Sequence, residues 1–260
     1  MNMKKAFITI TALAMCALAV SCKNEDKTAA LMRAAANNNV SEARRLIRAK
    51  ADVNEMSGYI EYYDAFAVTP LMCAANYNAA DAVRLLIEHG ADVNAHDSSD
   101  DTALMEAASS NALDAARILI AAGADVNAEF NGKVTALRFA LWDNAADMAK
   151  LLIEAGADVN ARDREGRTGL MDAARDNAVD MVRLLIAAGA DVNAKGDFGE
   201  TALMKSARKN TADAAKLLIE AGADVNAKSN QGNTALILAK ENNSTDVMEL
   251  LKAAGAKTEE

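Results

Sequence analysis

The sequence predicts an all-α solenoid of about seven stacked helix pairs, with an extended finger between one pair and the next. A threonine recurs every 33 residues, at Thr69, Thr102, Thr135, Thr168, Thr201 and Thr234. The string Gly-Ala-Asp-Val-Asn-Ala recurs at the same interval, from Gly90, Gly123, Gly156, Gly189 and Gly222. Aromatic residues make up only 4% of the 260 residues, which favours a thin continuous core over one large core.

Each repeat carries start and stop signals for two short helices. The threonine suits the position before a first helix, because its hydroxyl accepts a hydrogen bond from an early backbone N–H. That helix is expected to end at an asparagine, which tolerates the left-handed backbone. These asparagines are Asn78, Asn111, Asn144, Asn177, Asn210 and Asn243. The second helix carries Val83 to Ile87 or its equivalent and is expected to end at the recurring glycine for the same reason.

One helix pair of this size cannot bury its own apolar stripe, so neighbouring repeats must stack. Stacking predicts polar substitutions at the two ends of the array. Arg45 replaces the Leu85-type residue in the first repeat, and Lys252 replaces the Ile87-type residue in the last. The expected domain is therefore 29–258, with repeats at about 29–54, 62–94, 95–127, 128–160, 161–193, 194–226 and 227–258.

These strings resemble the ankyrin repeat family, whose unit carries Thr-Pro-Leu-His, paired leucines in helix two and Gly-Ala-Asp-Val-Asn-Ala. The resemblance covers nearly the whole chain and implies a protein-binding module that uses its concave side. The family's histidine is replaced by Met72, Met105, Arg138, Met171, Met204 and Ile237, so its hydrogen-bond ladder is expected to be absent. Asparagine replaces the family's glycine between the helices and is expected to be conformationally equivalent.

Residues 1–21 are predicted to be a signal peptide of the lipoprotein type. A basic start is followed by a fifteen-residue apolar run, Ala6 to Val20, which is too short to span a bilayer comfortably. The stretch ending in Ser21-Cys22 resembles a bacterial lipobox, with its leucine one place early, and predicts lipidation of Cys22. Ordinary cleavage after Ala19 is the alternative and would give a soluble periplasmic protein.

On the lipoprotein reading, residues 22–28 form a short tether and the domain works close to the bacterial envelope, facing the periplasm or the outside. Lys23 weakly favours the outer membrane, by resemblance to enteric lipoproteins. The only cysteine left in the domain is Cys73, which has no partner for an intramolecular disulfide. We expect a monomer.

Charge and motifs argue against several functions. The net charge is −9, and an acidic chain is a poor ligand for nucleic acid or for an anionic membrane held by charge alone. The two histidines, His89 and His96, lack metal-ligand spacing. Ser206 and Lys209 match a Ser-x-x-Lys motif, but Ser206 falls at a packed alanine position of the repeat. We therefore expect no enzyme activity, no cofactor and no metal.

The candidate partner-binding residues lie where the repeats differ, because stacking does not dictate those side chains. Aromatic residues and arginine dominate binding hot spots, which selects Tyr77, Phe139, Trp142 and Arg175. The fourth repeat is the least regular of the array. The alternative is that its large side chains simply pack against one another across adjacent repeats.

The finger between the first two repeats is seven residues longer than the others. It contains four aromatic residues that we select as candidate contacts: Tyr59, Tyr62, Tyr63 and Phe66. A long aromatic finger is either a recognition element or a cover over the first repeat.

The expected function is binding of an unidentified protein at the bacterial envelope through the concave face and fingers. An inhibitor or immunity protein that blocks an exported enzyme or toxin is a second possibility, since acidic fingers suit a basic target. A structural envelope protein without a specific ligand is the third.

Overall fold

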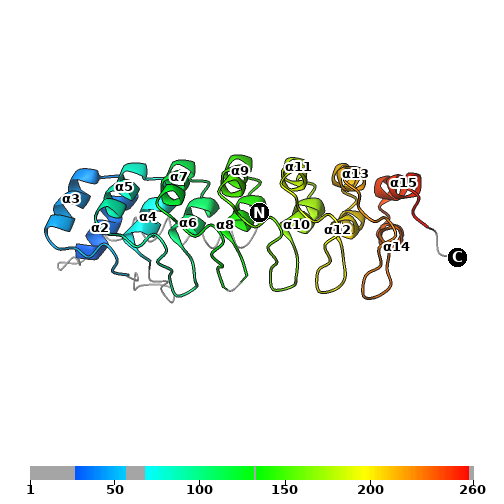
Figure 1. The fold of residues 1–260 in the computed structure, drawn as a ribbon, viewed down its shortest axis with the longest axis horizontal. Coiled ribbons are helices and arrows are strands. Elements are labelled where there is room, and N and C mark those ends of the chain that lie inside the picture. Colours follow the sequence, from blue (N-terminus) through cyan, green and yellow to red (C-terminus); the bar gives the residue numbers. More distant parts are fainter. Residues whose placement is uncertain (1–26, 57–67, 132, 258–260) are drawn as a thin grey trace. The chain divides into compact units, whose positions relative to one another are not determined.

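The computed structural model describes residues 27–56, 68–131 and 133–257. The described residues form fourteen helices in two compact units, one reaching to Phe139 and the other starting at Ala140 (Figure 1). Within those ranges, no helix has the length and apolar character needed to cross a membrane. The predicted signal peptide 1–21, Cys22 and most of the tether lie outside the described residues.

The first unit consists of helix pairs stacked in two rows. One row contains α2 (Lys27–Ala36), α4 (Pro70–Asn76) and α6 (Ala103–Ser109), each packed on the next. The other contains α3 (Val40–Arg48), α5 (Ala80–Glu88) and α7 (Leu113–Ala121). Helix α8 (Ala136–Trp142) contains the boundary between the units.

The second unit repeats the arrangement. Its first helices are α10 (Gly169–Arg175), α12 (Ala202–Lys209) and α14 (Ala235–Glu241). Its second helices are α9 (Ala146–Glu154), α11 (Val179–Ala187), α13 (Ala212–Glu220) and α15 (Thr245–Ala253). In both units the fingers extend on the side of the first helices (Figure 1). The predicted all-α helix-pair architecture is confirmed.

The predicted helix ends are also confirmed. Four of the threonines accept a hydrogen bond from the backbone N–H three residues ahead, at 3.2 to 3.4 Å: Thr69, Thr102, Thr201 and Thr234. Thr168 differs, because its buried Oγ1 has no partner. We call the asparagines between the two helices of each repeat the junction asparagines. Their φ angles lie between 52° and 54°, and those of the recurring glycines lie between 84° and 94°. Both sets therefore adopt the left-handed backbone.

The junction asparagines do more than turn the chain. The Oδ1 atoms of Asn38, Asn78, Asn177 and Asn210 accept from a backbone N–H of the second helix in the next repeat, at 2.9 to 3.2 Å. Helices α5, α7, α13 and α15 have no side-chain cap of their own. Each therefore receives its cap from the preceding repeat, so asparagine is not equivalent to glycine here.

A second asparagine ladder joins the loops that follow the second helices. The last asparagine of Asp-Val-Asn accepts from a backbone N–H in the next repeat at 2.7 or 2.8 Å, at Asn54, Asn94, Asn160, Asn193 and Asn226. Four of them also donate Nδ2 to the next repeat's glycine carbonyl, as Asn54 does to Gly90 at 3.0 Å. These bonds hold repeats in register without the family's histidine.

Buried apolar side chains fill the histidine position in four repeats, whereas the fourth repeat has Arg138 there, only 3% exposed. Met72, Met105, Met171 and Met204 are each 1% exposed. The end substitutions also behave as caps, because Arg45 and Lys252 are exposed whereas Leu85 is 2% exposed inside the stack.

Candidate functional site

The variable side chains gather on one surface in each unit, which we call the first-helix face. It comprises the fourth and seventh residues after the first five of the six recurring threonines: Cys73, Asn76, Glu106, Ser109, Phe139, Trp142, Asp172, Arg175, Lys205 and Arg208. Lys205 and Arg208 both bind Glu200, the last residue of the finger that precedes α12. The first-helix face therefore lies beside the fingers.

Residues of successive repeats contact each other along this face. In the first unit, Asn76 Nδ2 donates to Glu106 Oε2 at 2.6 Å. In the second unit, the indole Nε1 of Trp142 donates to Asp172 Oδ2 at 3.4 Å. The seventh residue of one repeat thus reaches the fourth residue of the next, which fixes the orientation of both side chains.

The second unit carries charges that are already paired. Arg175 binds Asp172 at 3.2 Å and Asp176 at 2.7 Å. Glu200 accepts from Arg208 at 2.7 and 2.9 Å and also binds Lys205. Burial raises the pKa of Glu200, but the hydrogen bonds from Lys205 and Arg208 bring this pKa below its ordinary value. This part of the face is a network of fixed ion pairs.

The first unit instead carries carboxyls without a basic partner. Burial, with the charges of Glu106 and Asp97, raises the pKa of Asp101 to about 8. Burial also raises the pKa of Glu106 to about 7, although the hydrogen bond from Asn76 acts in the opposite direction. Around this trio, the described residues place no lysine or arginine at ion-pair distance. We call Asp97, Asp101 and Glu106 the acidic trio.

The fingers are ordered by their own hydrogen bonds. In two fingers, Asp97 and Asp163 accept at Oδ1 from the backbone N–H groups two and four residues ahead, at 2.7 to 3.0 Å. Phe130 replaces this aspartate in the irregular fourth repeat, and its ring centroid lies 5.9 Å from that of Phe139. Neighbouring fingers are also joined at their tips, where Asn230 N donates to the Phe198 carbonyl at 3.0 Å.

The predicted contact residues differ in how far their side chains are exposed. Tyr77 is 36% exposed beside α4, and the side chain of Arg175 is 34% exposed. Trp142 is half-buried. Phe139 is only 5% exposed and packs on Phe130, so it offers little surface in the free chain.

The long finger between the first two repeats carries four of the predicted contact residues. Its candidate contacts Tyr59, Tyr62, Tyr63 and Phe66 lie outside the described residues, as Cys22 does. Their roles stay predictions.

One exposed aromatic residue was missed by the sequence reasoning. Phe198 stands at the tip of the finger before α12 and is 66% exposed. Ser99, Glu165 and Gln231 occupy the equivalent position in other fingers. Comparing finger tips in addition to first helices would have identified Phe198 as a candidate contact.

Comparison with known families identifies the scaffold that carries this surface. Among the described residues there is no group of three or more His, Cys, Asp or Glu side chains that could hold a metal ion. The family model described as ankyrin repeats, in three copies, matches residues 7–97, 31–130, 92–163, 128–196 and 170–260. The chain belongs to the ankyrin repeat family.

Solved ankyrin repeat structures resemble the chain over most of its length. The human ASB11 ankyrin repeat domain has a TM-score of 0.74 and 24% identity, covering 88% of this chain and 99% of its own. The ankyrin repeat domain of Bcl-3, a member of the IκB protein family, has a TM-score of 0.76 and 29% identity. That match covers 88% of this chain and 100% of the Bcl-3 domain. No curated protein matches in sequence.

Ankyrin repeat domains are generally protein–protein interaction modules and are typically not enzymes. This general role agrees with a constant stacking scaffold that carries a variable first-helix face.

Proposed function

We propose that this ankyrin repeat chain binds a protein partner at the bacterial envelope, where a lipid on Cys22 anchors it. The observation that carries the binding proposal is the first-helix face, where the side chains differ between repeats while the buried scaffold stays constant. Tyr77, Trp142 and Arg175 supply the aromatic and guanidinium groups typical of binding hot spots. Phe198 adds an exposed aromatic at a finger tip.

The surface is ordered before the partner arrives. Arg175 is held by two aspartates, and Trp142 is oriented by its hydrogen bond to Asp172. Side chains that are already fixed lose little conformational entropy on binding, which favours affinity. Rigid surface complementarity is therefore the mechanism we propose.

A second candidate function is inhibition of an exported enzyme or toxin, as an immunity protein would provide. The acidic trio favours this candidate, because three carboxyls without a basic neighbour suit a lysine or arginine from a partner. A structural envelope protein without a specific ligand is the remaining alternative, and it predicts no saturable binding.

Site-specific photo-crosslinking in intact cells tests the binding surface. A photoreactive residue at Tyr77, Trp142 or Phe198 is expected to form an adduct with the same single protein. The matched controls are Arg117 and Lys216, exposed on the second helices α7 and α13. Trp142→Ala should weaken binding of the captured protein by about 30-fold, as removal of a hot-spot residue does. Equal adducts from the second-helix positions would contradict the proposal.

Metabolic labelling with palmitate tests the anchor. The full chain is expected to incorporate label and to fractionate with membranes, because an acyl chain holds it there. Cys22→Ser should lose the label. Cys16→Ser, which changes the other cysteine of the N-terminal segment and lies within the predicted signal peptide, should keep it. Retention of label in Cys22→Ser would reject Cys22 as the lipidation site.

A further inference from the structure

The charge of this chain is divided unevenly between its first helix pair and the remainder. Residues 27–50 contain six basic residues and one glutamate, a net charge of +5. Residues 51–260 contain 19 Lys or Arg and 34 Asp or Glu, a net charge of −15. The six basic residues are Lys27, Arg33, Arg44, Arg45, Arg48 and Lys50. An acidic protein thus has one strongly basic segment.

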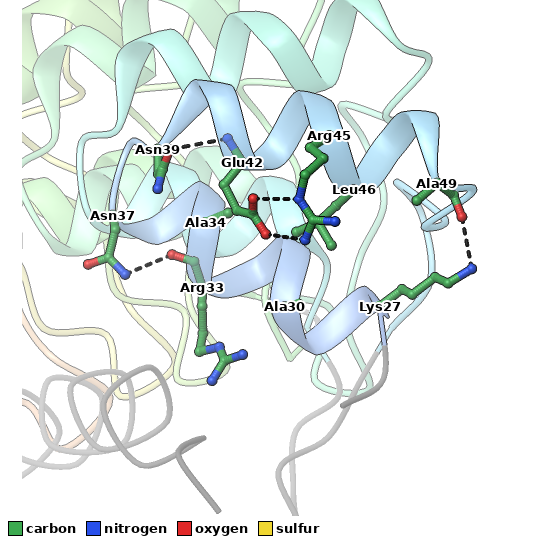
Figure 2. Close-up of a pocket in the computed structure, with 10 residues that line it drawn as sticks. All are labelled: Lys27, Ala30, Arg33, Ala34, Asn37, Asn39, Glu42, Arg45, Leu46 and Ala49. Atoms are coloured by element: carbon green, nitrogen blue, oxygen red, sulfur yellow. Dashed lines mark hydrogen bonds and ion pairs between the residues drawn. The ribbon is translucent and has the colours of Figure 1, made fainter. Parts of the chain in front are cut away.

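This segment forms the end of the first unit. Helix α2 packs on α4 and α3 packs on α5, and none of the described helices precedes this pair. The face turned away from α4 and α5 contains an open cavity of about 490 Å³ between α2 and α3 (Figure 2). Ala30, Ala34 and Leu46 supply apolar lining, and Lys27, Arg33 and Arg45 contribute basic groups to it. We call the exposed surface of this first helix pair, which carries all six basic residues, the basic end face.

Its positive charge is only partly compensated by carboxylates. Arg45 is paired with Glu42, through hydrogen bonds of 2.6 and 2.8 Å, and Lys27 Nζ donates to the Ala49 carbonyl (Figure 2). Arg48 and Lys50 are exposed, and Arg44 is partly exposed. For these last three, no carboxylate of the described residues lies at ion-pair distance. The end face therefore presents more cationic groups than it neutralises.

We propose that the basic end face docks on an anionic phospholipid bilayer. Lys and Arg side chains near an anionic leaflet are attracted within about one Debye length, roughly 8 Å at physiological salt. The acidic remainder of the chain is repelled by the same leaflet, so only this end can approach it. A nucleic acid is a poorer occupant, because a rod that extends past the end face meets the acidic repeats.

The position of this face along the chain supports the same occupant. Cys22 lies five residues before Lys27, a reach of roughly 17 Å when extended. A lipid at Cys22 would hold the basic end face next to the bilayer; this supporting step rests on the proposed function, whereas the charge distribution does not. Docking at this end leaves the first-helix face free for a protein.

Vesicle binding by the full chain carrying Cys22→Ser tests the proposal without any acyl group. We expect partitioning onto phosphatidylcholine vesicles that contain 30% phosphatidylglycerol, and little onto phosphatidylcholine alone. Reversing Arg44, Arg48 and Lys50 to glutamate should weaken partitioning by about 100-fold or more, because each basic group contributes about fivefold. Binding should also fall steeply in 0.5 M NaCl.

A charge-matched variant provides the control. Reversing Arg117, Lys216 and Lys252 to glutamate changes the net charge by the same amount on the exposed faces of α7, α13 and α15, and should alter partitioning less than threefold. Thermal unfolding confirms that both variants fold. Equal loss in both variants, or equal binding to uncharged vesicles, overturns the proposal. Self-association of the free chain that the first reversal abolishes also overturns it, because the face would then bind a second copy.

These outcomes are separable from those of the proposed function. A chain that takes no palmitate at Cys22 in cells can still bind anionic vesicles through its end face. Conversely, the chain can take palmitate at Cys22 in cells while reversal of the end-face charges leaves vesicle binding of the Cys22→Ser chain unchanged. That result supports the lipid anchor and rejects docking by the end face.

Discussion

Replacing Asn78 with glycine is expected to destabilise the protein by about 1–2 kcal/mol, although glycine keeps the left-handed backbone. The reason is the loss of two hydrogen bonds to the next repeat. Asn78 Oδ1 accepts from Ala115 N at 3.0 Å, and its Nδ2 donates to Asp114 at 3.3 Å. Asn78→Ala should cost about 2–4 kcal/mol, because alanine loses these bonds and also disfavours the left-handed conformation. Urea unfolding followed by circular dichroism measures both changes.

The last repeat offers an internal control for this prediction. Asn243 has the same backbone conformation, with φ 53°, but α15 is the last of the described helices, so none of them receives its side chain. Asn243→Gly should therefore leave the unfolding midpoint almost unchanged. If Asn243→Gly and Asn78→Gly cost the same, the bond between repeats is not what stabilises the junction.

Glu106→Gln is expected to stabilise the protein at pH 8 by up to roughly 3 kcal/mol and to have little effect at pH 5. Burial raises the pKa of Glu106 to about 7, so the folded state binds its proton more tightly than the unfolded state does. The contribution of the Glu106 carboxyl to the free energy of unfolding is greatest below pH 4.5 and falls as the pH rises to about 7. Glutamine stays uncharged and can still accept the hydrogen bond from Asn76.

Unfolding free energies of wild type and variant between pH 4 and pH 9 measure this effect. Asp101, whose pKa is raised to about 8, should extend the decline of wild-type stability to that pH. Glu200→Gln supplies a control of opposite sign. The pKa of Glu200 lies below its ordinary value, so its charged form is favoured in the folded state and the variant should lose stability above pH 5. Parallel pH profiles for Glu106→Gln and wild type would refute the prediction.

The helix pairs and their ends could be predicted from sequence because each depends on local chemistry. Threonine caps, left-handed asparagines and left-handed glycines act within a few residues of themselves, and the 33-residue period shows them six times. The function of asparagine between repeats was not predictable in this way. Asn78 and Ala115 are 37 residues apart, and nothing in a one-dimensional pattern shows that one side chain reaches the other.

The site was predicted less completely, for a related physical reason. Variation between repeats identified Trp142 and Arg175 but did not show that Asp172, on the same face, binds both side chains. Phe139 has an aromatic side chain at a variable position, yet an equally unusual Phe130 covers it. The raised pKa of Glu106 follows from its burial and from the nearby charge of Asp97, and only the folded chain produces both.

The loop asparagines have an evolutionary consequence. Asn94 and Asp125 are joined across 31 residues, whereas Asn54 and Asp92 form the same bond across 38, because the intervening finger is seven residues longer. The bond lengths are 2.8 and 2.7 Å, so the extra residues leave the junction between repeats undisturbed. A finger of this kind is a site where insertions and deletions can accumulate at little thermodynamic cost. New binding specificities can therefore arise by changes in finger length while the helical scaffold is inherited intact.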